Sequence, residues 1–259
     1  MATKQQIPAL AGSIVSKQEG FSVLSNEDAQ WAIENTEEAI RLACEAIRTR
    51  NNGANTEPAP APAPKHSIPS DTVSQLVKWK QLYEEVLGFE KAGYDEMPLP
   101  AATTGFGWLV VVKKGITIEA VIKALKTKMK VYRYTDNDLD EAVPTNERTA
   151  DHDYAITVRD QVEPDNDLRN TSAAQIAKKN PKLPTMTLLE RLLLELFYFH
   201  FTGEHLDIKG VTICAGSRDS GGRVPGVFWD PGSGGLYIDG CDAGNSDDDY
   251  GARAVQVTG

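Results

Sequence analysis

The chain has 259 residues, 41% of them hydrophobic, so it can bury a good-sized core. Its formal net charge of −10 argues against nonspecific binding to nucleic acid or to anionic membranes, because both repel an acidic surface. The three cysteines, Cys44, Cys214 and Cys241, are too few and too scattered for a disulfide framework or a tetrahedral zinc site.

The sequence from Met1 to Ser16 lacks the basic start and apolar stretch of a secretory signal, and no apolar run reaches bilayer-spanning length. We therefore expect no signal peptide and no membrane insertion, and the few scattered cysteines favour a reducing compartment. Cys214 lies within the apolar run VTIC and is expected to be buried. Cys241 lies between a glycine and an aspartate and is expected to be exposed.

Residues 26–48 place apolar side chains at helical spacing and predict an amphipathic helix within an N-terminal region, 1–50. Residues 51–69 contain the run EPAPAPAP, which favours an extended, semi-rigid linker. Residues 70–259 are expected to form one ligand-binding domain. The N-terminal helix either attaches or oligomerises the protein through its apolar face, or folds back on this domain.

The strongest helix signal follows Thr187, which forms a capping box with Glu190 ahead of the run LLERLLLELFYFHF. This run is apolar on nearly every side, so residues 188–199 are expected to be the central element of the core. Apolar periodicity predicts the earlier elements in chain order: a helix over 71–89, a strand over 107–112, a helix over 117–129, a strand over 131–134, a strand over 154–158 and one helical turn near 173–178.

From Gly210 to Val255 the chain contains no Lys, Glu, Gln or Met, although these four types make up about a fifth of all residues. Random drawing from the chain's own composition would leave such a gap on the order of once in ten thousand trials. Apolar alternations at 224–229, 236–238 and 252–257 predict strands here, which favours folded loops between strands over a flexible tail.

The genetic code offers a cause for this gap. Randomising the first two bases of an asparagine codon that ends in a pyrimidine yields residues such as Asp, Gly, Ser, Tyr, Cys and Asn, but never Lys, Glu, Gln, Met or Trp. Roughly half of the residues between Asp219 and Tyr250 are Gly, Asp or Ser. The composition of the segment therefore matches the product of such mutagenesis, apart from Trp229.

The run from Thr187 to Arg218, followed by RVPGVFW, a Gly/Asp/Ser-rich stretch and a closing ARAVQV, resembles the variable proteins of diversity-generating retroelements. Residues 108–165 are similar to the upstream part of such proteins in small-genome bacteria and their viruses. The resemblance implies an α+β, C-type-lectin-like domain with short twisted antiparallel strands and two main helices, preceded by N-terminal helices. It also implies a bacterial or viral protein, cytoplasmic or virion-associated, whose gene a reverse transcriptase rewrites with errors at adenines.

The resemblance further implies that the varied residues line an exposed binding surface. We expect a non-catalytic protein without a cofactor, whose ligand is a protein or another cell-surface molecule. We expect no nucleic acid as its direct ligand. Carried over residue by residue, the varied positions are Asp219, Ser220, Gly222, Gly226, Phe228, Asp230, Gly232, Ser233, Gly234, Gly235, Tyr237, Asp239, Gly240, Asp242, Asn245, Asp247, Asp248 and Asp249.

The residues between these positions are the expected fixed scaffold, because alternate residues of a strand point to opposite faces. Substitutions at Asp219, Phe228, Tyr237 or Asp247 should leave stability nearly unchanged, whereas Trp229→Ala should cost ~3 kcal/mol or more. The few aromatic anchors predict either weak binding or a preference for a cationic target through the aspartates. The expected scaffold residues are Val224, Pro225, Val227, Trp229, Leu236, Ile238, Ala252 and Arg253.

The Asp-rich stretch 239–249 leaves open a calcium site, because hard cations need several carboxylate oxygens in one loop. No nine-residue repeat, EF-hand spacing or calcium-ligating lectin motif is present, and a charge run is more often a solvated loop. This alternative, a calcium-binding Gly/Asp-rich domain, predicts that a chelator lowers the melting temperature.

An enzyme is the other alternative, because formylglycine-generating enzymes share the lectin-like fold. Those enzymes depend on reactive cysteines, and neither Cys214 nor Cys241 has a second cysteine at suitable spacing. Two further pairs do not fit a site: His200 and His205 lack the i, i+4 spacing of a helical zinc motif, and Glu190 and Glu195 do not share a helix face. We therefore expect a binding protein and not an enzyme.

Overall fold

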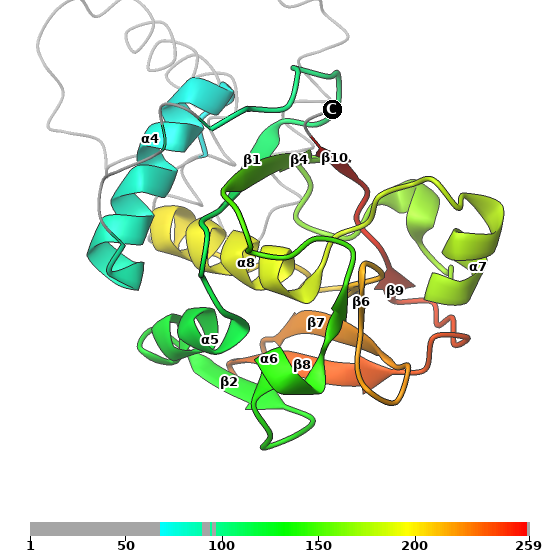
Figure 1. Cartoon of the computed structure of the whole chain (residues 1–259). Coiled ribbons are helices and arrows are strands. Elements are labelled where there is room, and N and C mark those ends of the chain that lie inside the picture. The colour runs from blue at the N-terminus through cyan, green and yellow to red at the C-terminus, as the bar shows by residue number, and fades with distance from the viewer. Residues whose placement is uncertain (1–67, 90–93, 95–96, 258–259) are drawn as a thin grey trace, which may run out of the picture. The chain divides into compact units, whose positions relative to one another are not determined.

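The computed structural model describes residues 68–89, 94 and 97–257. The expected N-terminal helix region, 1–50, lies outside these residues, and so does the linker as far as residue 67. The described residues form an α+β domain in which one long helix contacts both main sheets (Figure 1). None of the described helices is long and apolar enough to cross a membrane.

The smaller main sheet has the strand order β1-β4-β10 and is antiparallel throughout. Almost all residues of its first two strands are buried, so both faces of this sheet are covered. Its first two strands confirm the strands predicted over 107–112 and 154–158. The three strands are β1 (Trp108–Val112), β4 (Tyr154–Val158) and β10 (Val255–Val257).

Helix α4 (Thr72–Leu82) continues into a π-helical turn, η2 (Tyr83–Leu87), and confirms the helix predicted over 71–89. It begins at Asp71, whose carboxylate accepts a hydrogen bond from the Ser74 N–H at 2.7 Å. In Figure 1 the helix lies beside β1, and it contacts that strand directly.

Side chains of α4 and η2 satisfy the backbone along the outer edge of β1. Gln75 accepts a hydrogen bond from the Leu109 N–H at 2.7 Å, and Trp79 Nε1 donates to the Leu109 carbonyl at 2.8 Å. The Tyr83 hydroxyl donates to the Val111 carbonyl at 2.8 Å. An edge strand is thus covered by a helix that supplies the hydrogen bonds a further strand would have made.

The larger main sheet is mixed and has the order β2-β8-β7-β5-β9. β2 pairs with β8 and β5 with β9 in parallel, whereas β7 is antiparallel to both of its neighbours, so the expectation of antiparallel strands holds only in part. The strands are β2 (Lys130–Arg133), β5 (Val211–Ile213), β7 (Val224–Asp230), β8 (Gly235–Cys241) and β9 (Tyr250–Gly251).

Helix α5 (Ile118–Lys126) lies between β1 and β2 in the chain, so the predicted succession of strand, helix and strand is confirmed. The two strands nevertheless belong to different sheets, and α5 connects those sheets instead of returning the chain to one of them. The shorter elements are α6 (Leu139–Ala142), β3 (Thr145–Asn146), which pairs with β6 (Ser217–Arg218), η3 (Asn166–Leu168) and α7 (Ala173–Lys179).

Helix α8 (Leu188–Thr202) is the central element of the core, as predicted. Its capping box is present, because the Thr187 side chain accepts from the Glu190 N–H while the Glu190 carboxylate accepts from the Thr187 N–H. The helix ends at Gly203, which has the left-handed φ of 72° that suits glycine. Residues 188–198 are all buried, and α8 contacts α4, α5, β1 and β7.

The larger sheet has an inner face that is fully covered and an outer face that is only partly covered. On the inner face, Val227, Leu236 and Ile238 belong to the same core as α8. On the outer face, Val224 and Cys241 at one end of β7 and β8 pack into a second apolar cluster with η3 and α7. The described residues leave the other end of the outer face open, and this end holds the candidate site.

Candidate ligand-binding face

The open part of the outer face carries three aromatic rings at one register across β2, β8 and β7. Tyr132 is the cross-strand partner of Tyr237, and Tyr237 is the partner of Phe228. The ring centroids of Tyr132 and Tyr237 are 4.7 Å apart, and those of Tyr237 and Phe228 are 5.2 Å apart. The planes are tilted by only 23° and 13°, so the rings stack into one line. We call these three residues the aromatic row.

An aspartate and a glycine flank the aromatic row on each side. On one side Asp239 of β8 faces Gly226 of β7, and on the other Asp230 of β7 faces Gly235 of β8. The Tyr132 ring lies over Gly235, where a Cβ would come within 2.5 Å of the ring. The Tyr132 ring thus occupies the space of a Gly235 side chain, and the Cys241 sulfur occupies that of a Gly226 side chain. We call the aromatic row with these four flanking residues the open face.

Burial follows the predicted alternation along both strands. All the expected scaffold residues are buried except Trp229, which is half-buried. The expected varied residues that are exposed or half-buried are Ser220, Gly222, Phe228, Asp230, Gly232, Ser233, Gly234, Tyr237, Asp239, Gly240, Asp242, Asn245, Asp247, Asp248 and Asp249. The other three, Asp219, Gly226 and Gly235, are buried.

Asp219 departs from the expectation of an exposed, freely replaceable residue, since only 6% of its surface is exposed. Its carboxylate accepts hydrogen bonds from the N–H groups of Gly221 and Arg223 at 2.9 and 2.8 Å and from Arg223 Nε at 2.8 Å. Burial by itself would raise the pKa of this carboxyl, but the Arg223 hydrogen bonds and charge outweigh it and lower the pKa. Asp219 therefore holds its loop together, and substitutions there should cost stability.

Four of the expected varied glycines accept side chains poorly. Gly222 and Gly234 have φ values of 83° and 63°, which other residues adopt only with strain. A Cβ on Gly226 would lie 2.7 Å from the sulfur of Cys241, and one on Gly235 would meet the Tyr132 ring. These positions suit glycine for structural reasons, so the open face varies most easily at its aromatic and acidic residues.

Both described cysteines are buried, which confirms the expectation for Cys214 and corrects the one for Cys241. Cys241 ends β8 opposite Val224, and its sulfur lies over Gly226 within the second apolar cluster. Burial raises the pKa of both thiols above the ordinary value, so both stay in the less nucleophilic protonated form at neutral pH.

Side chains of the acidic loop from Asp242 to Asp249 make hydrogen bonds within the loop. Asp242 Oδ1 accepts from the Gly244 N–H at 2.7 Å, and Asn245 Nδ2 donates to Asp247 Oδ2 at 3.0 Å. In the part of the chain that the structure describes, no three His, Cys, Asp or Glu side chains are grouped closely enough to hold a metal ion. The effect of a chelator stays a prediction of the calcium alternative.

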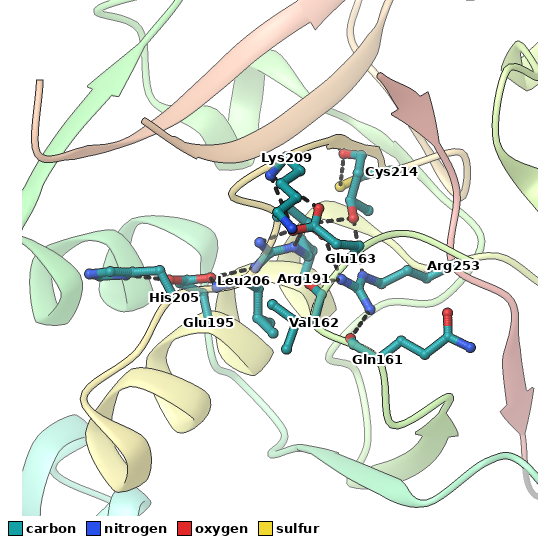
Figure 2. Close-up of polar contacts among 12 residues, drawn as sticks. Gln161, Val162, Glu163, Arg191, Glu195, His205, Leu206, Lys209, Cys214 and Arg253 are labelled. Carbon is teal, nitrogen blue, oxygen red and sulfur yellow. Dashed lines mark hydrogen bonds and ion pairs between the residues drawn. The ribbon is translucent and has the colours of Figure 1, made fainter. Parts of the chain in front are cut away.

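His205 belongs to a structural contact between α8 and β7. Its Nδ1 lies 2.8 Å from Glu195 Oε1, and its ring stacks between Trp229 and Phe199, with centroids 3.3 and 4.7 Å away. Glu195 also accepts a hydrogen bond from Arg191 Nη1 at 3.0 Å. Figure 2 shows His205, Glu195 and Arg191 in this order, leading from the half-buried ring into the core.

The same network continues to the C-terminal segment through a buried ionic cluster, part of which Figure 2 shows. Asp207 accepts hydrogen bonds from Arg191 Nε at 2.8 Å and from Arg253 Nη2 at 2.5 Å, and also from the Thr212 hydroxyl at 2.6 Å. All four side chains are fully buried. Removing one partner from such a cluster typically costs about 3–5 kcal/mol. The cluster links β5 and the segment around Arg253 to α8. It therefore stabilises the inner side of the larger sheet and is not part of the open face.

Sequence reasoning missed one member of the open face. Tyr132 lies outside the segment from Gly210 to Val255, and only the parallel pairing of β2 with β8 brings it beside Tyr237. A short strand of four residues gives no sequence signal for its partner strand, so no local pattern could have placed this ring.

Comparisons of the chain with protein-family models, with curated proteins and with solved structures found no significant match.

Proposed function

We propose that this protein is a non-catalytic binding protein with a C-type-lectin-like domain, whose open face is diversified by retroelement-driven adenine mutagenesis. The α+β architecture around α8, with a mixed sheet of short strands, is compatible with that fold. Ligand contact would come from the exposed side chains of β7, β8 and the loops that follow them. The buried side chains between them would stay fixed.

The main support for the proposal is the absence of Lys and Glu from a segment that contains many exposed residues. Lys and Glu are among the residues most often found on protein surfaces. The segment from Gly210 to Val255 exposes the loops around β7 and β8, including the acidic loop, and leaves most of the outward side chains of both strands exposed or half-buried, yet it contains neither Lys nor Glu. Burial would explain the absence of Lys and Glu from a core, but it does not explain their absence from an exposed face. A codon restriction does explain it.

The proposal is tested by placing the missing residue types on the open face. Phe228→Lys, Tyr237→Glu and Asp239→Lys should each change the free energy of unfolding by less than about 1 kcal/mol, because these side chains contact only solvent and their cross-strand neighbours on the outer face. Thermal or urea unfolding followed by circular dichroism measures the change.

The matched controls are Val227→Lys and Leu236→Glu, on the inner face of the same strands, which should prevent folding or cost more than about 4 kcal/mol by burying an unpaired charge. If the outer substitutions cost as much as the inner ones, the absence of Lys and Glu has a structural cause and the proposal is wrong.

A further inference from the structure

Strand β2 has one edge that no described strand pairs with. It is the first strand in the order β2-β8-β7-β5-β9, and Figure 1 shows it at the outside of that sheet. The Tyr134 N–H donates to the Ile238 carbonyl at 3.0 Å, which fixes the direction of the backbone groups along β2. Because these groups alternate along a strand, those of Tyr132 point to β8, whereas those of Val131 and Arg133 point to the free edge. Among the described residues, these outward groups have no hydrogen-bond partner.

The aromatic row ends at this free edge. Tyr237 stacks on one face of the Tyr132 ring, and the other face points away from β8 with no described ring over it. Of the Tyr132 surface, 39% is exposed. A further ring on that side would continue the row, since aromatic side chains at opposed positions of neighbouring strands stabilise a sheet.

The two ends of this edge carry opposite charges. Lys126 and Lys128 precede β2, whereas Asp136 and Asp138 follow it, and all four side chains are exposed. None of the four forms an ion pair within the described residues. A second β2 therefore fits beside the first in the antiparallel direction, because a parallel neighbour would bring like charges together.

We infer that β2 is the contact surface for a second copy of this chain, which joins the two larger sheets through an antiparallel pair of β2 strands centred on Tyr132. In this register Val131 of one copy lies opposite Arg133 of the other, so each outward backbone group gains a partner. Tyr132 meets Tyr132 of the other copy at a non-hydrogen-bonded position, where the Cα atoms are about 4.5 Å apart. The same register sets Lys128 level with Asp136 of the other copy.

Lys130 is compatible with this register, although a lysine on an edge strand often prevents pairing. Its opposite position is Tyr134 of the other copy and not a second lysine. Like charges therefore do not face each other across the pair.

The pairing would place two open faces side by side, with the aromatic rows of both copies in one line. A ligand that presents repeated groups could then be bound by both copies at once. Residues 130–133 lie outside the segment from Gly210 to Val255, so changes in that segment would leave the contact between copies intact. The pairing goes beyond the proposed function and does not depend on diversification.

Reversing single charges tests the pair. Sedimentation equilibrium of the full chain, from micromolar to near-millimolar concentration, should show the mass of one copy at the low end and of two copies at the high end. Lys128→Glu and Asp136→Lys should each weaken this association about tenfold or more, because both ion pairs of the dimer become repulsive. The double variant restores opposite charges and should regain the wild-type association. The matched control is Lys178→Glu, at an exposed position of α7, which should leave association unchanged.

Cysteine cross-linking tests the register. Tyr132→Cys should form a disulfide between two copies under mild oxidation, because the central pair has the Cα separation that a disulfide needs. Lys130→Cys should not, since its opposite position is Tyr134. The wild type reports any cross-linking through Cys44.

Four results would overturn the inference. The first is the mass of one copy at every concentration. The second is an association that neither charge reversal weakens, which would place the contact on another surface, such as the helix predicted over 26–48. The third is a pair of opposite effects from Lys128→Glu and Asp136→Lys, which would show that only net charge matters. The fourth is a disulfide in Lys130→Cys and none in Tyr132→Cys. Failure of the proposed function is seen separately, in the unfolding of Phe228→Lys and Tyr237→Glu.

Discussion

Two aspartates from the same Gly/Asp-rich segment have opposite electrostatic environments. Asp219 precedes β7 and is buried among donors that lower the pKa of its carboxyl. Asp239 lies on the open face, where none of the described residues donates a hydrogen bond to it, and desolvation raises the pKa of its carboxyl. The sequence places both among the expected varied residues, because an Asp codon carries no information about which N–H groups will surround the side chain. The structure separates a loop-forming aspartate from a surface one.

Asp219→Asn should lower the free energy of unfolding by about 1–2 kcal/mol at pH 7, because the charged acceptor of two backbone N–H groups is lost. The folded pKa of Asp219 lies below its unfolded value near 3.8, so its contribution is present above that pH and is lost as the pH falls through the folded pKa. The difference from the wild type should therefore shrink under acidic conditions.

Asp239→Asn should change the free energy of unfolding in the opposite direction. Its folded pKa lies above 3.8, so the ionised form is disfavoured in the folded protein, and stability is lost as the pH rises through the folded pKa. The variant should be slightly more stable than the wild type at pH 7 and equal to it in acid. Thermal unfolding from pH 2.5 to 7 compares both variants, and changes of the same sign would contradict this account.

At the scale of elements, the hydrogen bonds between α4 and β1 show how a helix closes a sheet edge. Gln75 is fully buried and binds β1 through both ends of its amide, since it accepts from the Leu109 N–H and donates to the Gly107 carbonyl at 2.6 Å. Trp79 and Tyr83 extend the same pattern along the strand. The helix therefore supplies both apolar cover and specific polar partners.

Gln75→Leu should cost about 2–3 kcal/mol, because it leaves a buried N–H and a buried carbonyl of the β1 edge without partners. Gln81→Leu is the matched control on the same helix. Gln81 is exposed and contacts only Glu85 at 3.1 Å among the described residues, so its replacement should stay within about 0.5 kcal/mol. Urea unfolding measures both variants, and equal costs would show that the edge contacts contribute little.

The positions of the helices and strands along the chain were largely predictable from the sequence, whereas the pairing of strands within the sheets was not. The capping box of Thr187 and Glu190 and the apolar run after it are local signals, so the sequence located α8 and its central place correctly. The alternation around Val227 and Ile238 also gave the inner face. Strand pairing depends on residues far apart in the chain, so neither the separation of β1 from β2 nor the position of Tyr132 followed from periodicity.

At the scale of the whole described domain, a fixed core and an open face occupy opposite sides of the larger sheet. The inner side is held by α8 and by the buried cluster of Arg191, Asp207 and Arg253. The sequence indicated Arg253 as scaffold, but it gave no sign that two arginines share one aspartate, because charged residues usually predict a surface. Attachment through the N-terminal helix stays a prediction.

This arrangement explains how the outer residues could change while the fold persists. The core of the domain is complete without Phe228, Tyr237 or Asp239, whose side chains lie on the far side of the sheet from α8. Diversification is tolerated only where such a separation exists, since a core substitution would typically cost several kcal/mol.

The most direct measurement of the central claim is to sequence the 3′ end of the gene, and the DNA around it, across a growing population. The account predicts a near-copy of this end beside a reverse transcriptase gene, with changes confined to positions where the copy has adenine. The changes should fall on Phe228, Tyr237, Asp239 and the exposed loop residues and should spare Val227, Trp229 and Leu236. An invariant 3′ end without a repeat would contradict the account and leave a fixed acidic surface, for which the calcium alternative would then be tested with a chelator.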